Sequence, residues 1–145
     1  MTSMIQQPTY SPHHTDLLSP FQREGQQIYD QPIYDRLQIT PQQLMEFCQK
    51  WQIAELAVFG SILRDDFRVG GDDPSDVDFL YLFTEGVRYS LFDVMHLREE
   101  LEAILDRKVD FVSKTAIQNS RNWLRRKEIL ESGMIIYEKR SAIIA

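Results

Sequence analysis

Two aspartates separated by one residue, Asp76 and Asp78, open the most apolar stretch of the chain, DVDFLYLF. Side chains alternate across a β-strand, so both carboxylates would project from one face and the apolar residues at 77, 79, 81 and 83 from the other. Two neighbouring anions repel each other unless a cation or a proton compensates them. The pattern therefore predicts a ligand pair for a hard metal ion such as Mg²⁺, which prefers oxygen ligands.

A third carboxylate, Asp110, lies in the short apolar run KVDFV, where Val109 and Phe111 have the opposite parity. If this run is a strand beside that of Asp76 and Asp78, the three carboxylates share one face of the sheet. They could then hold one or two Mg²⁺ ions together with substrate phosphates. Each aspartate taken alone has a simpler interpretation as a solvated residue, because the open face of a sheet is usually polar.

A Gly-Ser pair, Gly60 and Ser61, directly follows the apolar run 53–59. Gly is typical of a tight turn, and a turn that opens a helix presents backbone N–H groups to an anion. We expect a strand, this turn and then a short helix over residues 62–67. Arg64 would lie on that helix, either in reach of a phosphate or acceptor, or simply solvated.

The remaining pattern predicts the elements that position these residues. We expect strands at 53–59, 76–83, 109–112 and 134–138. A first helix should run from Thr40-Pro41 to about residue 51, and another should start at Ser90 with Asp93 in its capping box. A second long helix should be capped by Thr115 and stopped by a left-handed Gly133. Residues 68–75 form a loop. This order predicts an α/β (α+β) fold with a mixed β-sheet and helices packed on one face.

The first 39 residues differ in composition from the rest, with seven Gln and four of the six Pro. Such a segment hardly buries enough apolar surface to offset its ordering entropy, although Ile33, Tyr34 and Leu37 could pack onto the domain. We therefore expect residues 1–39 to be a flexible or partly ordered N-terminal extension and residues 40–145 to be the folded domain.

Charge and composition exclude several classes of protein. With 16 Lys+Arg against 22 Asp+Glu the net charge is −6, which argues against direct binding of nucleic acid through Lys and Arg. The single cysteine, Cys48, cannot form an intrachain disulfide, and the longest apolar run is far shorter than the roughly 20 residues that cross a bilayer. We expect a cytoplasmic protein without membrane association.

A basic run of four residues follows the third strand: Arg121, Arg125, Arg126 and Lys127. It is a second candidate for contact with a triphosphate or a partner. Because Arg121 and Arg125 share a helical stripe with Glu128, a solvated helix face is the favoured interpretation.

The stretch FGSILRDDFRVGGDDPSDVDFLYLF resembles the signature of the DNA polymerase β-like nucleotidyltransferase superfamily, in which Gly-Ser is followed by a spacer and then Asp-x-Asp. The small size, the Gly-Ser-x-x-Arg form and the Ser75-Asp76-Val77-Asp78 form resemble the minimal nucleotidyltransferases called MNT proteins, over residues 40 to 140. The spacer 62–75 is longer than is usual in the family. Loop extension costs little stability, so the fold would tolerate it.

The resemblance implies a role for each residue of the motifs. It assigns Gly60, Ser61, Arg64 and Ser75 to binding of the ATP substrate, Asp76 and Asp78 to Mg²⁺, and Asp110 to a second metal site or to the base that takes the proton of the attacking hydroxyl. The catalytic set is thus Asp76, Asp78 and Asp110.

The family also implies a partner. MNT proteins commonly act as antitoxins beside a HEPN-domain ribonuclease toxin, and the resemblance implies transfer of AMP from ATP to a tyrosine hydroxyl of that toxin. Two alternatives stay open: an antitoxin that neutralises the toxin by stable binding without catalysis, and an enzyme that modifies a small molecule.

Overall fold

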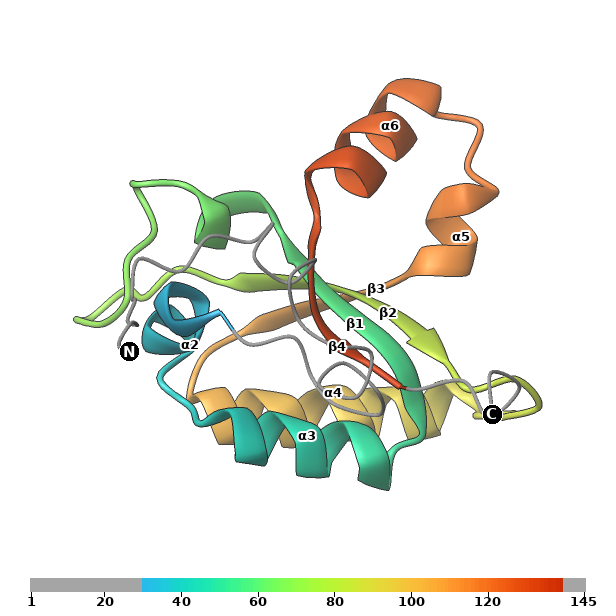
Figure 1. The fold of residues 1–145 in the computed structure, drawn as a ribbon, viewed down its shortest axis with the longest axis horizontal. Coiled ribbons are helices and arrows are strands. Elements are labelled where there is room, and N and C mark those ends of the chain that lie inside the picture. Colours follow the sequence, from blue (N-terminus) through green and yellow to red (C-terminus); the bar gives the residue numbers. More distant parts are fainter. Residues whose placement is uncertain (1–29, 140–145) are drawn as a thin grey trace, which may run out of the picture.

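The computed structural model describes residues 30–139, whose four strands form one sheet (Figure 1). The strands are β1 (Ile53–Phe59), β2 (Val77–Phe83), β3 (Val109–Ser113) and β4 (Met134–Glu138), in the spatial order β3-β2-β1-β4. β1 pairs antiparallel with both β2 and β4, whereas β2 and β3 are parallel. The sheet is therefore mixed, as predicted.

Two long helices, α3 (Pro41–Lys50) and α4 (Leu91–Leu105), cover one face of the sheet (Figure 1). α4 is the crossover that parallel pairing of β2 and β3 requires. Capping boxes at Thr40 and Ser90 start the two helices at the predicted residues. Their buried side chains, which pack on the sheet, are Leu44, Phe47 and Cys48 from α3 and Leu97, Leu101 and Leu105 from α4.

A further helix, α2 (Gln31–Leu37), lies within the segment predicted to be an extension. Asp30 caps it by accepting a hydrogen bond from the Ile33 N–H, and Tyr34 and Leu37 are buried in the main core. Part of the predicted extension is thus ordered and contributes to the core, and the domain boundary between residues 39 and 40 stays a prediction. The average composition of 39 residues concealed one short amphipathic helix. The rest of the predicted extension, 1–29, lies outside the described residues.

In addition to the predicted helices on one face, two short helices pack against the opposite face of the sheet. There Ile117 of α5 (Lys114–Gln118) and Ile129 of α6 (Trp123–Ser132) pack against Ala57 and Leu80. Leu80 has the same parity as Asp78, so the aspartate face becomes apolar two residues further along β2. An apolar patch of this kind needs cover, which α5 and α6 provide.

Two predicted local conformations differ from the structure. The single long helix predicted after β3 is two helices, α5 and α6, separated at residues 119–122. Ser113 caps α5 and Asn122 caps α6, whereas Thr115 was the predicted cap. Gly133 is extended, with φ −65°, rather than left-handed. Its small size matters instead, because a Cβ there would lie 3.1 Å from the carbonyl oxygen of Ile129.

The segment between β1 and β2 holds a short 3₁₀ helix, η2 (Gly60–Leu63), where a helix over 62–67 was expected. Arg64 caps it in an extended conformation, and a long loop then leads to Asp76. Within residues 30–139, no helix has both the length and the apolar character needed to cross a membrane.

Candidate active site

Asp78 and Asp110 are direct partners in the register of the parallel strands β2 and β3. Burial raises the pKa of Asp78 to about 6, and a hydrogen bond with Asp110 and repulsion from Asp110 and Asp76 act in the same direction, while Arg64 opposes them. The two carboxyl groups are thus close enough to influence each other's ionisation. A cation bound between them would relieve their repulsion in place of a proton.

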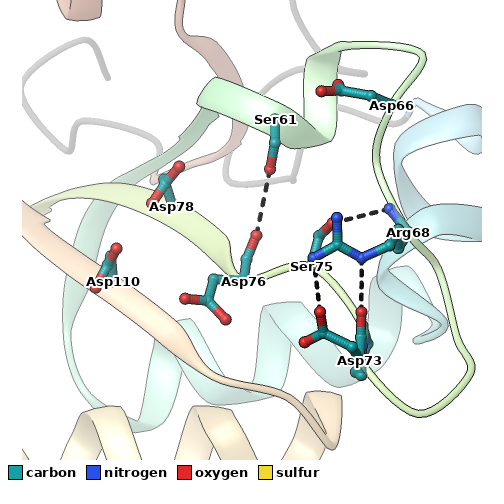
Figure 2. Close-up of a pocket in the computed structure, with 9 residues that line it drawn as sticks. Ser61, Asp66, Arg68, Asp73, Ser75, Asp76, Asp78 and Asp110 are labelled. Carbon is teal, nitrogen blue, oxygen red and sulfur yellow. Dashed lines mark hydrogen bonds and ion pairs between the residues drawn. The ribbon is translucent and has the colours of Figure 1, made fainter.

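The Gly60 turn lies directly against this pair. Gly60 has φ +77°, and a Cβ built there would overlap the Oδ2 atom of Asp78. Only glycine provides both the left-handed backbone and the space for the carboxylate. The Ser61 hydroxyl donates a hydrogen bond of 3.5 Å to the carbonyl oxygen of Asp76, so the turn also contacts the residue before β2 (Figure 2).

A polar cavity of about 420 Å³ opens beside the turn (Figure 2). It is lined by Ser61, Asp66, Arg68, Asp73, Pro74, Ser75, Asp76, Asp78 and Asp110. The cavity therefore brings together the three predicted carboxylates and two of the four residues predicted to bind nucleotide.

The other two predicted nucleotide-binding residues, Gly60 and Arg64, line an adjoining cavity of about 520 Å³. Its wall also includes Phe59, Leu63, Asp78, Arg125, Glu128, Ile129 and Ser132. Asp78 thus belongs to both cavities. The Arg64 side chain is exposed and forms an ion pair of 3.4 Å with Asp66.

Ser75 has a clear role in the loop that precedes β2. It is buried, its hydroxyl accepts a hydrogen bond of 2.9 Å from the Arg68 N–H, and its own N–H donates to the Arg68 carbonyl at 2.9 Å. Ser75 thereby joins the two ends of the loop. Its contact with nucleotide stays a prediction.

Sequence reasoning missed several residues of the two cavities. Asp66, Arg68 and Asp73 come from the long loop, where no motif marked them. Arg125, interpreted as part of a solvated face, lines the second cavity from α6, which begins after the break at residues 119–122. The spacing of Arg125, Ile129 and Ser132, at i, i+4 and i+7, places them on one helix face and could have indicated this from the sequence.

The donor set fits Mg²⁺. Among residues 30–139, no group of three or more His, Cys, Asp or Glu side chains is already drawn together at metal-binding spacing. The pair of Asp78 and Asp110 nevertheless offers oxygen donors whose mutual repulsion a cation relieves, and Asp76 lines the same cavity. Mg²⁺ is commonly held by one or two carboxylates, with substrate phosphates and water completing its shell.

Similar proteins identify the family of this chain. The family model of the nucleotidyltransferase domain matches residues 41–136. Protein adenylyltransferase MntA of Thermococcus cleftensis is 35% identical over 74 residues, which cover 51% of this chain and 69% of that protein. A Methanocaldococcus jannaschii relative is 34% identical over 70 residues, covering 48% and 66%. The matches thus span about two thirds of the length of these relatives.

A crystal structure of the toxin-antitoxin MntA-HpeT superposes with a TM-score of 0.50 at 14% identity, covering 70% of this chain and 75% of that one. This likeness concerns the fold and confirms the predicted fold class. The matched domain, residues 41–136, contains the Gly60 turn, all three aspartates and Arg125. The chain therefore belongs to the nucleotidyltransferase domain family and is a nucleotidyltransferase.

Proposed function

We propose that this nucleotidyltransferase transfers AMP from ATP to a tyrosine hydroxyl of a HEPN-domain ribonuclease toxin in the cytoplasm, and so acts as its antitoxin. The observation that carries the proposal is the register pair of Asp78 and Asp110 with the Gly60 turn against it. The name of the Thermococcus cleftensis relative, a protein adenylyltransferase, supports a protein acceptor. The toxin-antitoxin complex of similar fold supports the nature of the partner.

In the proposed reaction, the acceptor oxygen attacks the α-phosphorus of ATP. A new P–O ester bond forms, the bond from the α-phosphorus to the bridging oxygen breaks, and pyrophosphate leaves. Asp110, which is exposed to the cavity, accepts the hydroxyl proton in this scheme. Mg²⁺ held by Asp76, Asp78 and Asp110 would neutralise charge on the phosphates.

The residues around the carboxylates would bind the rest of ATP. The Gly60-Ser61 turn offers backbone N–H groups and a hydroxyl to the β- and γ-phosphates, and Arg64 lies on the next cavity wall. Most of the rate gain would come from position and from charge neutralisation rather than from covalent participation of the protein. Addition of AMP places a negative phosphate on the toxin, which would repel RNA there.

Stable binding without transfer is the second candidate function. Trp123 and Leu124 at the start of α6 are exposed, at 58% and 63%, and lie in the same helix as Arg125 of the second cavity. Exposed apolar side chains of this size favour contact with a protein. A pure binder, however, gains nothing from two like charges held together as Asp78 and Asp110 are.

The two candidates separate in one experiment. The purified protein is incubated with its toxin, Mg²⁺ and ATP labelled on the α-phosphate, and both toxin labelling and residual ribonuclease activity are measured. Transfer predicts that Asp76→Asn with Asp78→Asn abolishes labelling and protection together. If this double variant still protects at equal concentration, binding is the antitoxin mechanism. An unlabelled toxin with the unaltered protein rejects transfer.

A further inference from the structure

Arg107, which lies between α4 and β3, is buried with 8% of its surface exposed. Among the described residues, no carboxylate lies within ion-pair distance of its guanidinium. A buried charge is tolerated only where other polar groups compensate the water it loses. The partners of Arg107 therefore show what this residue holds in place.

The hydrogen-bond partners of its guanidinium are backbone carbonyls of one loop. Nη1 donates to the carbonyl of Ser75 at 3.0 Å and to that of Arg68 at 3.3 Å, and Nη2 donates to that of Val69. The guanidinium carbon also lies 5.1 Å from the centre of the Phe67 ring. One side chain thus joins the two ends of the loop 68–75.

The loop ends at Asp76, and this residue precedes the first residue of β2, Val77. Strand pairing therefore fixes Asp78 and Asp110 but does not fix Asp76. The carbonyl of Ser75 belongs to the peptide bond that leads into Asp76, and Arg107 holds it. On the other side, the Val77 N–H donates to the carbonyl of Lys108, the residue next to Arg107, at 3.1 Å.

Two hydrogen bonds between Ser75 and Arg68, and the bonds of the Arg68 side chain to Asp73, also close the loop. The middle of the loop has no such support. Gly70 and Gly71 are adjacent, a Cβ atom added to either would have no neighbour within 4 Å, and Gly71 has φ +91°. Two glycines in sequence leave a backbone with many accessible conformations. The bonds between Ser75 and Arg68 lie within the loop, and the bond from the Ser61 hydroxyl to the Asp76 carbonyl is long, at 3.5 Å. Arg107 is therefore the side chain that ties both ends of the loop to the rest of the domain.

We propose that Arg107 is a positioning residue that holds Asp76 toward the cavity shared with Asp78 and Asp110, so that the three carboxylates can bind one divalent cation. This inference rests on the proposed function for its catalytic meaning. Its physical content, the direction of Asp76, can be measured without any turnover.

Three variants of the full chain test the proposal. Arg107→Met removes every donor but keeps an apolar stem, and Arg107→Lys keeps the charge but lacks the planar group that spans three carbonyls. Arg88→Met is the matched control, since Arg88 is an exposed arginine at the other end of β2. Asp76→Asn serves as the reference for loss of the ligand.

The measurements are Mn²⁺ binding, followed by electron paramagnetic resonance, and hydrogen exchange of backbone amides. We expect Arg107→Met to weaken Mn²⁺ binding about tenfold or more, as Asp76→Asn does, and Arg107→Lys to fall between it and the unaltered protein. Exchange should accelerate at Ser75 and Val77 but not at Leu80 within β2. Arg88→Met should match the unaltered protein in both measurements.

Several results would overturn the proposal: Mn²⁺ affinity unchanged in Arg107→Met or Arg107→Lys, no effect of Asp76→Asn, or no Mn²⁺ binding by the unaltered protein. If Arg107→Met does not fold, Arg107→Lys decides alone. AMP transfer is assayed separately on the same samples. If the Mn²⁺ results are as expected but no AMP is transferred, the proposed function is rejected and the positioning role stands. If AMP is transferred but the Arg107 variants bind Mn²⁺ as the unaltered protein does, the positioning role is rejected and the proposed function stands.

Discussion

Asp78 and Asp110 occupy the same register position of the parallel strands β2 and β3, and this backbone pairing holds two like charges together. The strands cannot separate the carboxyls without breaking the sheet, so the repulsion must be relieved chemically. Burial of Asp78 and the neighbouring carboxylates together raise its pKa to about 6, so a proton relieves the repulsion at mildly acidic pH. A divalent cation relieves it at neutral pH.

The raised pKa of Asp78 predicts a specific dependence of stability on pH. The folded protein binds this proton more tightly than the unfolded chain, whose aspartates titrate near 3.9. Its contribution to the free energy of unfolding is therefore complete below about pH 4 and is lost as pH rises through about 6. The site is partly open to solvent, so we expect a loss of about 1 kcal/mol.

Urea unfolding in the presence of a chelator, at a series of pH values, measures this loss. Asp78→Asn should remove the dependence and make the metal-free protein more stable than the unaltered chain at pH 7. Added Mg²⁺ should restore stability to the unaltered chain only. An equal pH dependence in both proteins would contradict the assignment to Asp78.

Gly60→Ala should be far more damaging than Gly71→Ala. Both glycines have positive φ, +77° and +91°, so alanine strains the backbone by about 1–2 kcal/mol at either position. At Gly60 the new Cβ also overlaps the Asp78 carboxylate, whereas at Gly71 nothing lies within 4 Å. We expect nearly complete loss of AMP transfer for Gly60→Ala and retained transfer for Gly71→Ala. Similar AMP transfer by the two variants would show that the close approach of Gly60 to the Asp78 carboxylate is not needed for activity.

Leu37→Ala tests whether α2 belongs to the folded domain. Leu37 is fully buried, so its truncation should lower the free energy of unfolding by about 2–5 kcal/mol. Leu91→Ala, at a side chain that is 75% exposed, should change it by no more than about 0.5 kcal/mol. Equal, small effects in chemical denaturation would place residues 30–39 outside the cooperative unit.

Arg125→Gln should impair use of ATP, because Arg125 lines the cavity that contains Gly60, Arg64 and Asp78. We expect kcat/KM for ATP to fall about tenfold or more, as for loss of a charged contact. Lys127→Gln, at an exposed residue of the same helix outside the cavity lining, is the control and should leave kcat/KM unchanged. The opposite order of effects would contradict the orientation of α6.

The sequence predicted the parts of the fold that depend on local pattern. β1 has the predicted bounds, α3 and α4 start at the predicted caps, and strand parity placed Asp78 and Asp110 on one face. These features follow from alternation, capping chemistry and helical spacing, which are properties of a few neighbouring residues.

The missed features depend on contacts between distant segments. α2 is stabilised by burial of Tyr34 and Leu37 in a core contributed by residues far along the chain. The two ends of the loop 68–75 are held by Arg107, which lies 32 residues beyond Ser75. Arg125 lies in α6, which starts as a separate helix because the Asn122 side chain accepts a hydrogen bond from the Arg125 N–H and so caps a new helix there. A single sequence shows none of these pairings directly.

Transfer of AMP to the toxin at the three carboxylates is best tested by measuring the mass of the intact toxin. After incubation with ATP and Mg²⁺, we expect the toxin mass to increase by whole AMP units, with the modified tyrosine identified by peptide fragmentation. The increase should be absent with a chelator and absent with Asp78→Asn. An unmodified toxin that the unaltered protein nevertheless neutralises, or equal modification by Asp78→Asn, would contradict transfer at this site.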